Sequence, residues 1–134
     1  MGDRIDWLFQ EWHRLGGAVL LAKIDPSIKA RHPEEVIAES TAYCRESGRL
    51  TWIVLDWLLH HISDVNERVL LEKTKECGDI PVLGVLCDAA YQRNPDVKFE
   101  KIIRACQPNA VPEPFFSRVA RSPLASRLAR ENSL

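Results

Sequence analysis

Two long, almost uninterrupted apolar segments constrain the fold of this chain more than any other feature. The first spans Leu50 to Ile62 and the second spans Ile80 to Tyr91. A helix that is apolar nearly all the way round belongs in the middle of a domain. We prefer helices because both segments run past ten residues, and the first continues through Trp57 without a turn residue. The sequence therefore predicts an all-α fold built around two solvent-excluded helices.

The same spacing also permits an α/β fold with three short parallel strands. Three apolar runs, spaced about thirty residues apart, would be the strands: Ala18 to Ile24, Leu50 to Leu55 and Ile80 to Leu86. Buried parallel strands are continuous apolar runs, so periodicity alone does not separate them from buried helices. In that fold a crevice at the strand ends would be the natural ligand site.

Four further helices are predicted from apolar periodicity and from start and stop signals. They cover residues 3–15, 33–46, 64–77 and 97–106. Pro33 suits the first position of its helix, and Gly48 suits the position after that helix ends. Asp79 and Pro81 form a start signal for the second apolar segment.

An internal echo suggests how these helices pair. Glu46-Ser47-Gly48-Arg49-Leu50 recurs thirty positions later as Glu76-Cys77-Gly78-Asp79-Ile80, and a strongly apolar segment follows each copy. The repeated unit would be a charged outer helix, a glycine turn and a buried inner helix. This pattern predicts compact stacked helical hairpins with about five to six helices. We place this body at residues 1–107, followed by a proline-rich linker and an arginine-rich arm at 108–134.

Composition and charge fit one small globular domain. The chain has 134 residues, of which 46% are hydrophobic and 28% charged, an ordinary globular balance. Residues 1–116 hold 14 Lys and Arg against 18 Asp and Glu, so an acidic body precedes a basic arm. The start of the chain does not resemble a signal peptide, and no apolar stretch is long enough to span a bilayer. We expect a cytoplasmic protein with no membrane association. Its separated cysteines are expected to be reduced core residues: Cys44, Cys77, Cys87 and Cys106.

The only candidate for catalysis is weak. Asp56 and His60 are four residues apart on a predicted helix, where a carboxylate can orient a histidine as a general base. Asp64 joins them only if the helix continues through Ser63. The favoured interpretation is that Asp56 and His60 are simply the polar residues of an otherwise apolar helix and satisfy each other's hydrogen bonds. No phosphate loop, nucleophile elbow or metalloprotease sequence is present, so we expect no cofactor and no metal, and an enzyme is not the favoured class.

Two surface features point to a partner instead. Glu35, Glu39 and Glu46 share the outer face of their predicted helix, where like charges repel. The favoured interpretation is a solvated face; the alternative is that the chain's own arm or a basic partner docks there. Trp7 lies opposite Trp12, beside Gln10, Glu11 and Arg14, and is expected to be partly exposed. An exposed tryptophan is a candidate interface residue.

The arm carries the strongest functional signal. Two aromatic anchors follow a proline, and aliphatic residues then alternate with four arginines: Phe115, Phe116, Arg118, Arg121, Leu124, Arg127, Leu128 and Arg130. Such a segment gains order by docking. We expect Phe115 and Phe116 to dock on the chain's own body and the residues past Ser117 to bind a partner.

The leading hypothesis is thus a non-catalytic protein-interaction module that clamps a partner with its arm. A domain followed by an arm is a plan typical of small bacterial regulatory subunits and antitoxins. The alternative is a weak nucleic-acid-binding regulator whose arginines contact phosphates. Partner identity and oligomeric state are left open by the sequence.

Overall fold

The computed structural model describes residues 2–28 and 31–106, and every regular element in them is helical. The elements are α1 Gly2–Arg14, α2 Pro33–Thr41, α3 Gly48–His61, a 3-10 turn η1 Ile62–Asp64, α4 Glu67–Cys77, α5 Ile80–Arg93 and α6 Val97–Cys106. The all-α prediction is confirmed. The parallel-strand alternative is wrong for these residues, because two of the three runs lie in α3 and α5 and the third, after α1, is irregular.

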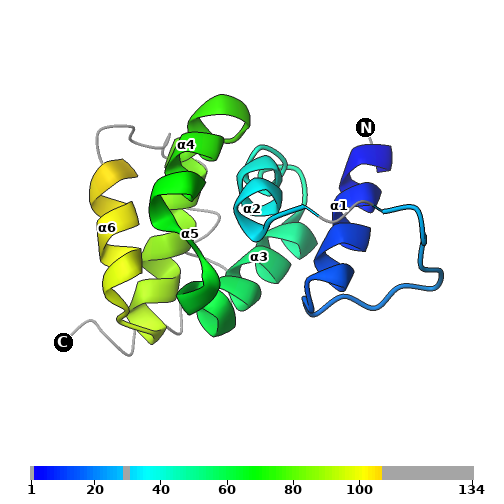
Figure 1. The fold of residues 1–134 in the computed structure, drawn as a ribbon, viewed down its shortest axis with the longest axis horizontal. Helices are drawn as coiled ribbons and strands as arrows, with labels where there is room; N and C mark the ends of the chain where they lie inside the picture. The colour runs from blue at the N-terminus through cyan, green and yellow to red at the C-terminus, as the bar shows by residue number, and fades with distance from the viewer. Residues whose placement is uncertain (1, 29–30, 107–134) are drawn as a thin grey trace.

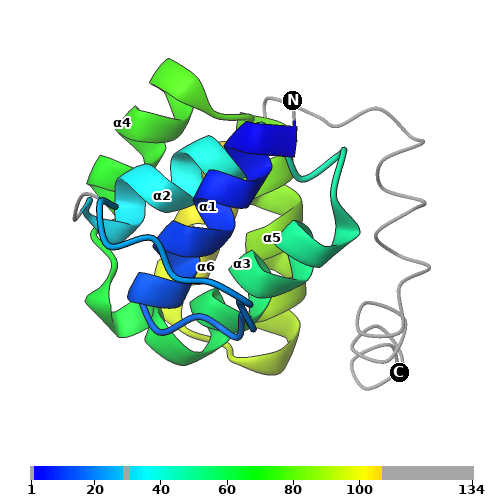
Figure 2. The same cartoon turned by 90° about the vertical axis from the view of Figure 1, so that its right-hand side faces the viewer.

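The helices form a short stack of two hairpins (Figure 1). Along the long axis of the molecule, α1 is followed by the pair α2 and α3, then by the pair α4 and α5, and finally by α6. The outer helix α2 packs on α4, and the inner helix α3 packs on α5, so each hairpin lies on the next (Figure 2). Helix α1 covers one end of the stack, and α6 covers the other end by packing on α5 and α4.

The two inner helices are parallel and match residue for residue. Ser47 caps the N-terminus of α3 and Asp79 caps that of α5, thirty-two residues later. An ion pair of 3.1 Å between Arg45 and Asp79 joins these two starts. At the other ends, the Asn94 side chain donates a hydrogen bond of 3.2 Å to the carbonyl of Leu59. The predicted hairpin stack is therefore present, with a period two residues longer than the sequence echo.

The predicted end of α2 and the predicted role of Gly48 are wrong. Helix α2 ends at Thr41 rather than near Glu46, and the chain continues to Ser47 in turns whose amides bond to carbonyls three residues back. The Thr41 hydroxyl donates to the carbonyl of Ala38 and accepts the amide of Asp79, which fixes this end against the next hairpin. Gly48 does not follow a helix end but opens α3, where Ser47 supplies the cap.

Helix α4 begins at Glu67, not at residue 64, because Val65 enters the core in an extended conformation. Asn66 then caps the helix, and its own backbone amide donates to the buried Glu34 carboxylate over 2.8 Å. The ammonium group of Lys98 bonds to the carbonyl oxygens of Ser63 and Val65 at 3.1 and 2.7 Å. These contacts tie the turn between the hairpins to α2 on one side and to α6 on the other.

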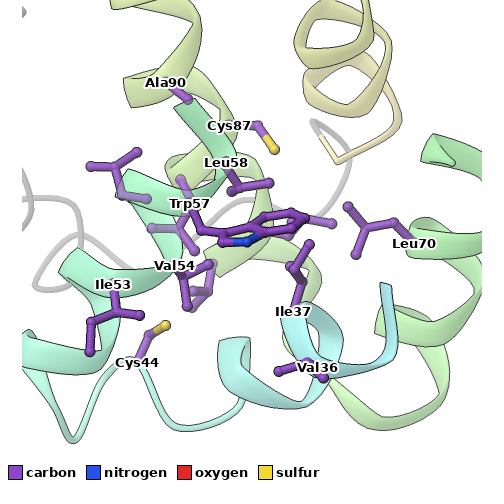
Figure 3. Packing of buried hydrophobic residues seen from close by; sticks show 14 of the residues in the cluster. Val36, Ile37, Cys44, Ile53, Val54, Trp57, Leu58, Leu70, Cys87 and Ala90 are labelled. Atoms are coloured by element: carbon purple, nitrogen blue, oxygen red, sulfur yellow. The ribbon is translucent and has the colours of Figure 1, made fainter. Parts of the chain in front are cut away.

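The core runs continuously through the stack. Trp57 of α3, Ile37 of α2 and Leu70 of α4 point into one apolar interior (Figure 3). Trp12 brings α1 into it, with its ring 5.6 Å from that of Trp57 and its indole nitrogen donating to Ser40. Because each buried indole N–H has a partner, these large side chains carry no unpaired polar group.

Three of the four cysteines are buried, as predicted, and Cys77 is not. Burial raises the pKa of the Cys44 thiol to about 12 and that of Cys106 to about 11, so both thiols stay protonated at neutral pH. Cys77 is exposed because it ends α4 on the outer side of the stack, beyond the reach of the core. None of the described helices combines the length and apolar character needed to cross a membrane.

Candidate interaction surface

One side of α3 is exposed, contrary to the prediction that this helix is solvent-excluded. Trp52 has 43% of its surface exposed, although most other large apolar residues of α3 are buried. Asp56 and His60 continue the same stripe at four-residue intervals. The helix packs on α1, α2 and α5, and this stripe lies on the side that these helices leave open. Its surface therefore combines an aromatic ring with a carboxylate.

A second apolar side chain lies near the start of this stripe. Leu20, in the connection between α1 and α2, is 92% exposed. Arg49 holds the backbone of Leu20, because its guanidinium donates a hydrogen bond of 3.3 Å to the Leu20 carbonyl. The same guanidinium lies above the ring of Phe9, 4.8 Å from its centre. Arg49 is also the neighbour of Trp52 one turn earlier on α3. We call Leu20, Arg49, Trp52 and Asp56 the Trp52 face.

The connection that carries Leu20 is held on the body by side chains of α1. The Gln10 side-chain amide donates a hydrogen bond of 2.9 Å to the carbonyl of Lys23 and accepts one of 2.9 Å from the backbone amide of Asp25. Arg14 donates to the carbonyl of Arg31 over 2.9 Å. Gly16 makes the sharp turn after α1 possible, because its φ of +84° is a conformation that favours glycine. Leu20 is thus exposed on a fixed segment of backbone.

The Asp56 carboxylate lies beyond hydrogen-bond distance of the His60 ring. The His60 ring is 66% exposed, and its Nδ1 lies 2.8 Å from the backbone carbonyl of Asp56 but 3.6 Å from the carboxylate. Asp64 does not join them, because α3 ends at His61 and Asp64 lies near that histidine instead, at 3.7 Å. Among residues 2–28 and 31–106, no three histidine, cysteine or acidic side chains are grouped to hold a metal ion.

Four charged side chains, the ion cluster, join α1, the connection and α2: Arg4, Glu11, Arg31 and Glu39. Both carboxylate oxygens of Glu11 accept hydrogen bonds of 2.6 Å from Arg31. Arg31 also lies 3.0 Å from Glu39, which pairs with Arg4 as well. The side chain of Glu11 is only 2% exposed. Glu11 lies on the side of α1 that apolar periodicity predicts to be exposed, but the returning connection covers it and supplies its partner.

This cluster also corrects the interpretation of the acidic stripe on α2. Glu39 does not lie on a solvated face, and Glu46 lies beyond the end of the helix. The cations that face Glu39 in the described residues come from α1 and from the connection. Burial raises the pKa of the Glu39 carboxyl, but the hydrogen bonds and charges of Arg4 and Arg31 outweigh that effect, so its pKa lies below the ordinary value.

Acid is expected to weaken the ion cluster through Glu39. Its lowered folded-state pKa means that the carboxylate stabilises the fold fully above the unfolded value, 4.5, and less as the pH falls through the folded value. In urea titrations, the free energy of unfolding of the natural protein should fall more between about pH 5 and about pH 3 than that of Glu39→Gln. Glu72→Gln, in an exposed pair with Arg68 on α4, is the control. Identical pH slopes for the natural protein and Glu39→Gln would contradict the assignment.

The other predicted partner-binding residues are placed as follows. Trp7 is half-buried on α1, in agreement with the expectation that it is partly exposed, but Trp52 is the more exposed tryptophan. The arm residues lie outside the described part of the chain: Phe115, Phe116, Arg118, Arg121, Leu124, Arg127, Leu128 and Arg130. Trp52 is not among the predicted partner-binding residues because it belongs to an apolar run, and its position opposite Leu50 and Val54 on the helical wheel is the local signal of its exposure.

Comparisons of the chain with family models, with curated proteins and with solved structures found no match. The functional proposal therefore depends on the chain's own residues.

Proposed function

We propose that this chain is a non-catalytic protein-interaction module, in which a stack of helical hairpins presents the Trp52 face and the arginine-bearing arm clamps a protein partner. The observation that carries the proposal is the exposure of Trp52 on α3 and of Leu20 in the connection whose backbone carbonyl accepts a hydrogen bond from Arg49 of the same helix. Tryptophan is enriched among the residues that dominate binding energy at interfaces. The geometry of Asp56 and His60 gives no support to the alternative of an enzyme site.

The Trp52 face has the makeup of an interface centre. It combines a large aromatic ring, an aliphatic side chain, a guanidinium and a carboxylate, so both apolar and charged contacts are available to a partner. The connection that carries Leu20 is held at Lys23 and Asp25 by Gln10, and the Leu20 carbonyl accepts a hydrogen bond from Arg49. A surface fixed in this way loses little conformational entropy on binding. Arginines of the arm, such as Arg118 and Arg121, would add contacts to acidic groups of the partner.

The proposal is tested by photo-crosslinking in cells, with a benzophenone amino acid placed at position 20 or 52 of the full chain. Position 72, exposed on the outer helix α4, is the matched control. One and the same protein should be captured from positions 20 and 52 but not from 72, and a chain that ends at residue 116 should lose it.

Two outcomes would refute this function. Equal capture from all three positions would show non-specific contact, and capture unaffected by the truncation would remove the arm from the interaction. Retention of nucleic acid that falls steeply with salt and vanishes when the four arginines become alanine would instead favour the nucleic-acid alternative.

A further inference from the structure

We infer that the Trp52 face has an occupant within this chain, and that in the free protein Phe115 and Phe116 pack against Trp52. This inference rests on the proposed function, because it concerns the same surface, and it specifies what covers that surface before a partner binds. The Trp52 face is the feature that calls for an occupant, because Trp52 is 43% exposed and Leu20, whose backbone is bonded to Arg49 on the same helix, is 92% exposed. Covering such side chains with aromatic rings removes apolar area from water.

The place where the described chain ends supports this occupant. Helix α6 runs antiparallel to α5, and its last residue, Cys106, lies beside Gly84, since a β-carbon built on Gly84 would come within 2.9 Å of the Cys106 β-carbon. Gly84 is the fifth residue of α5, and Trp52 is the fifth residue of α3. Because α3 and α5 are parallel and in register at both ends, Cys106 and Trp52 lie at the same level of the stack.

The length of chain after Cys106 is sufficient to reach the Trp52 face. Trp52 and Cys106 are on helices separated by α5, so the span corresponds to two helix-to-helix distances, about 20 Å. Phe115 is nine residues past Cys106, which corresponds to about 30 Å of extended chain. Pro108, Pro112 and Pro114 favour an extended path over this stretch. A much shorter linker would not reach.

Charge complementarity points the same way. Asp56 lies one turn after Trp52 on α3, and Asp88 occupies the equivalent ninth position of α5, also exposed. The two parallel helices therefore carry one carboxylate each at the same level of the stack, and that of Asp56 is part of the Trp52 face. Arg118 and Arg121 follow the two phenylalanines by only a few residues. Docking of the aromatic pair would bring these guanidinium groups towards the carboxylates, so the aromatic and charged contacts support each other.

The test is a nuclear magnetic resonance measurement on the purified full chain, observing the indole N–H signals of its four tryptophans. Trp52→Phe identifies the Trp52 signal. The double variant Phe115→Ser/Phe116→Ser should shift this signal and speed its exchange with water, whereas the signals of the buried Trp12 and Trp57 should not move, which shows that the body is intact. Val119→Ser/Leu124→Ser is the matched control in the same arm and should leave the Trp52 signal near its natural position.

Two results would overturn the inference. A Trp52 signal that does not respond to Phe115→Ser/Phe116→Ser would mean that the aromatic pair lies elsewhere. A Trp52 signal that shifts on dilution of the natural chain, by contrast, would identify a second copy as the occupant. Neither result bears on capture of a partner from positions 20 and 52 in cells, so failure of this inference is distinguishable from failure of the proposed function.

Discussion

Replacing Gly78 with alanine is expected to lower the free energy of unfolding by about 3 kcal/mol or more. A β-carbon at this position would lie 2.3 Å from the carbonyl oxygen of Ala38 and 2.6 Å from the hydroxyl oxygen of Thr41. Both atoms belong to α2, and one of them is backbone, so neither moves aside without displacing the helix. The backbone conformation of Gly78 is extended and open to any residue, so the effect is purely steric.

Gly48 provides a matched control for this substitution, because it is the glycine that occupies the same place in the sequence echo. A β-carbon there would meet nothing within 4 Å, and Gly48 lies in the first turn of α3. Gly48→Ala is therefore expected to be neutral or to stabilise by up to about 1 kcal/mol. Urea unfolding followed by circular dichroism measures both variants. A Gly78→Ala protein within about 0.5 kcal/mol of the natural chain would show that α2 and α4 are not held this closely.

Replacing Arg31 with methionine is expected to cost about 3 kcal/mol of stability, because it removes both hydrogen bonds to a carboxylate that is almost completely buried. This stability loss is at the lower end of the range for removing one partner of a buried ion pair, because Arg31 itself is about a quarter exposed. The loss arises mainly from the uncompensated charge of Glu11. Removing that charge as well, in the double variant Glu11→Met/Arg31→Met, should restore most of the stability.

Urea unfolding of the two single variants and the double variant gives the coupling energy between Glu11 and Arg31. Arg68→Met is the control, because its pair with Glu72 on α4 is exposed and should be worth less than about 0.5 kcal/mol. If the double variant were as unstable as Arg31→Met, the loss would have to come from packing of the arginine side chain. If Arg31→Met unfolded no more easily than Arg68→Met, the buried charge of Glu11 would not need Arg31 for its stabilisation.

Most of the helical framework was predictable from local sequence. The caps Ser47 and Asp79 satisfy the first amides of α3 and α5, and the apolar runs behind them bury one side of each helix, whatever else the chain does. Periodicity likewise identified α1 and α6, whose buried residues include Trp12 and Phe99. These signals are local, because hydrogen bonds within a helix join residues only four positions apart.

The candidate surface was not predictable to the same extent. The apolar run predicts Trp52 to be one more core residue, and it is exposed because none of the helices in residues 2–28 and 31–106 covers that side of α3. Glu11 reads as a surface residue, and it is buried because the connection returns across α1 with Arg31. In both cases, the presence or the lack of a covering segment that is distant in sequence decides how far the side chain is exposed.

The sequence by itself thus determined which segments are helical and where most of them begin, because capping and apolar periodicity act within a few residues. The tertiary structure alone decided which helices meet, how closely Gly78 approaches Ala38, which charge is buried and which tryptophan faces outward. These outcomes depend on contacts between residues that are twenty or more positions apart. Such contacts exist only once the hairpins have stacked, since the packing of one helix on another sets both the distances and the access of water.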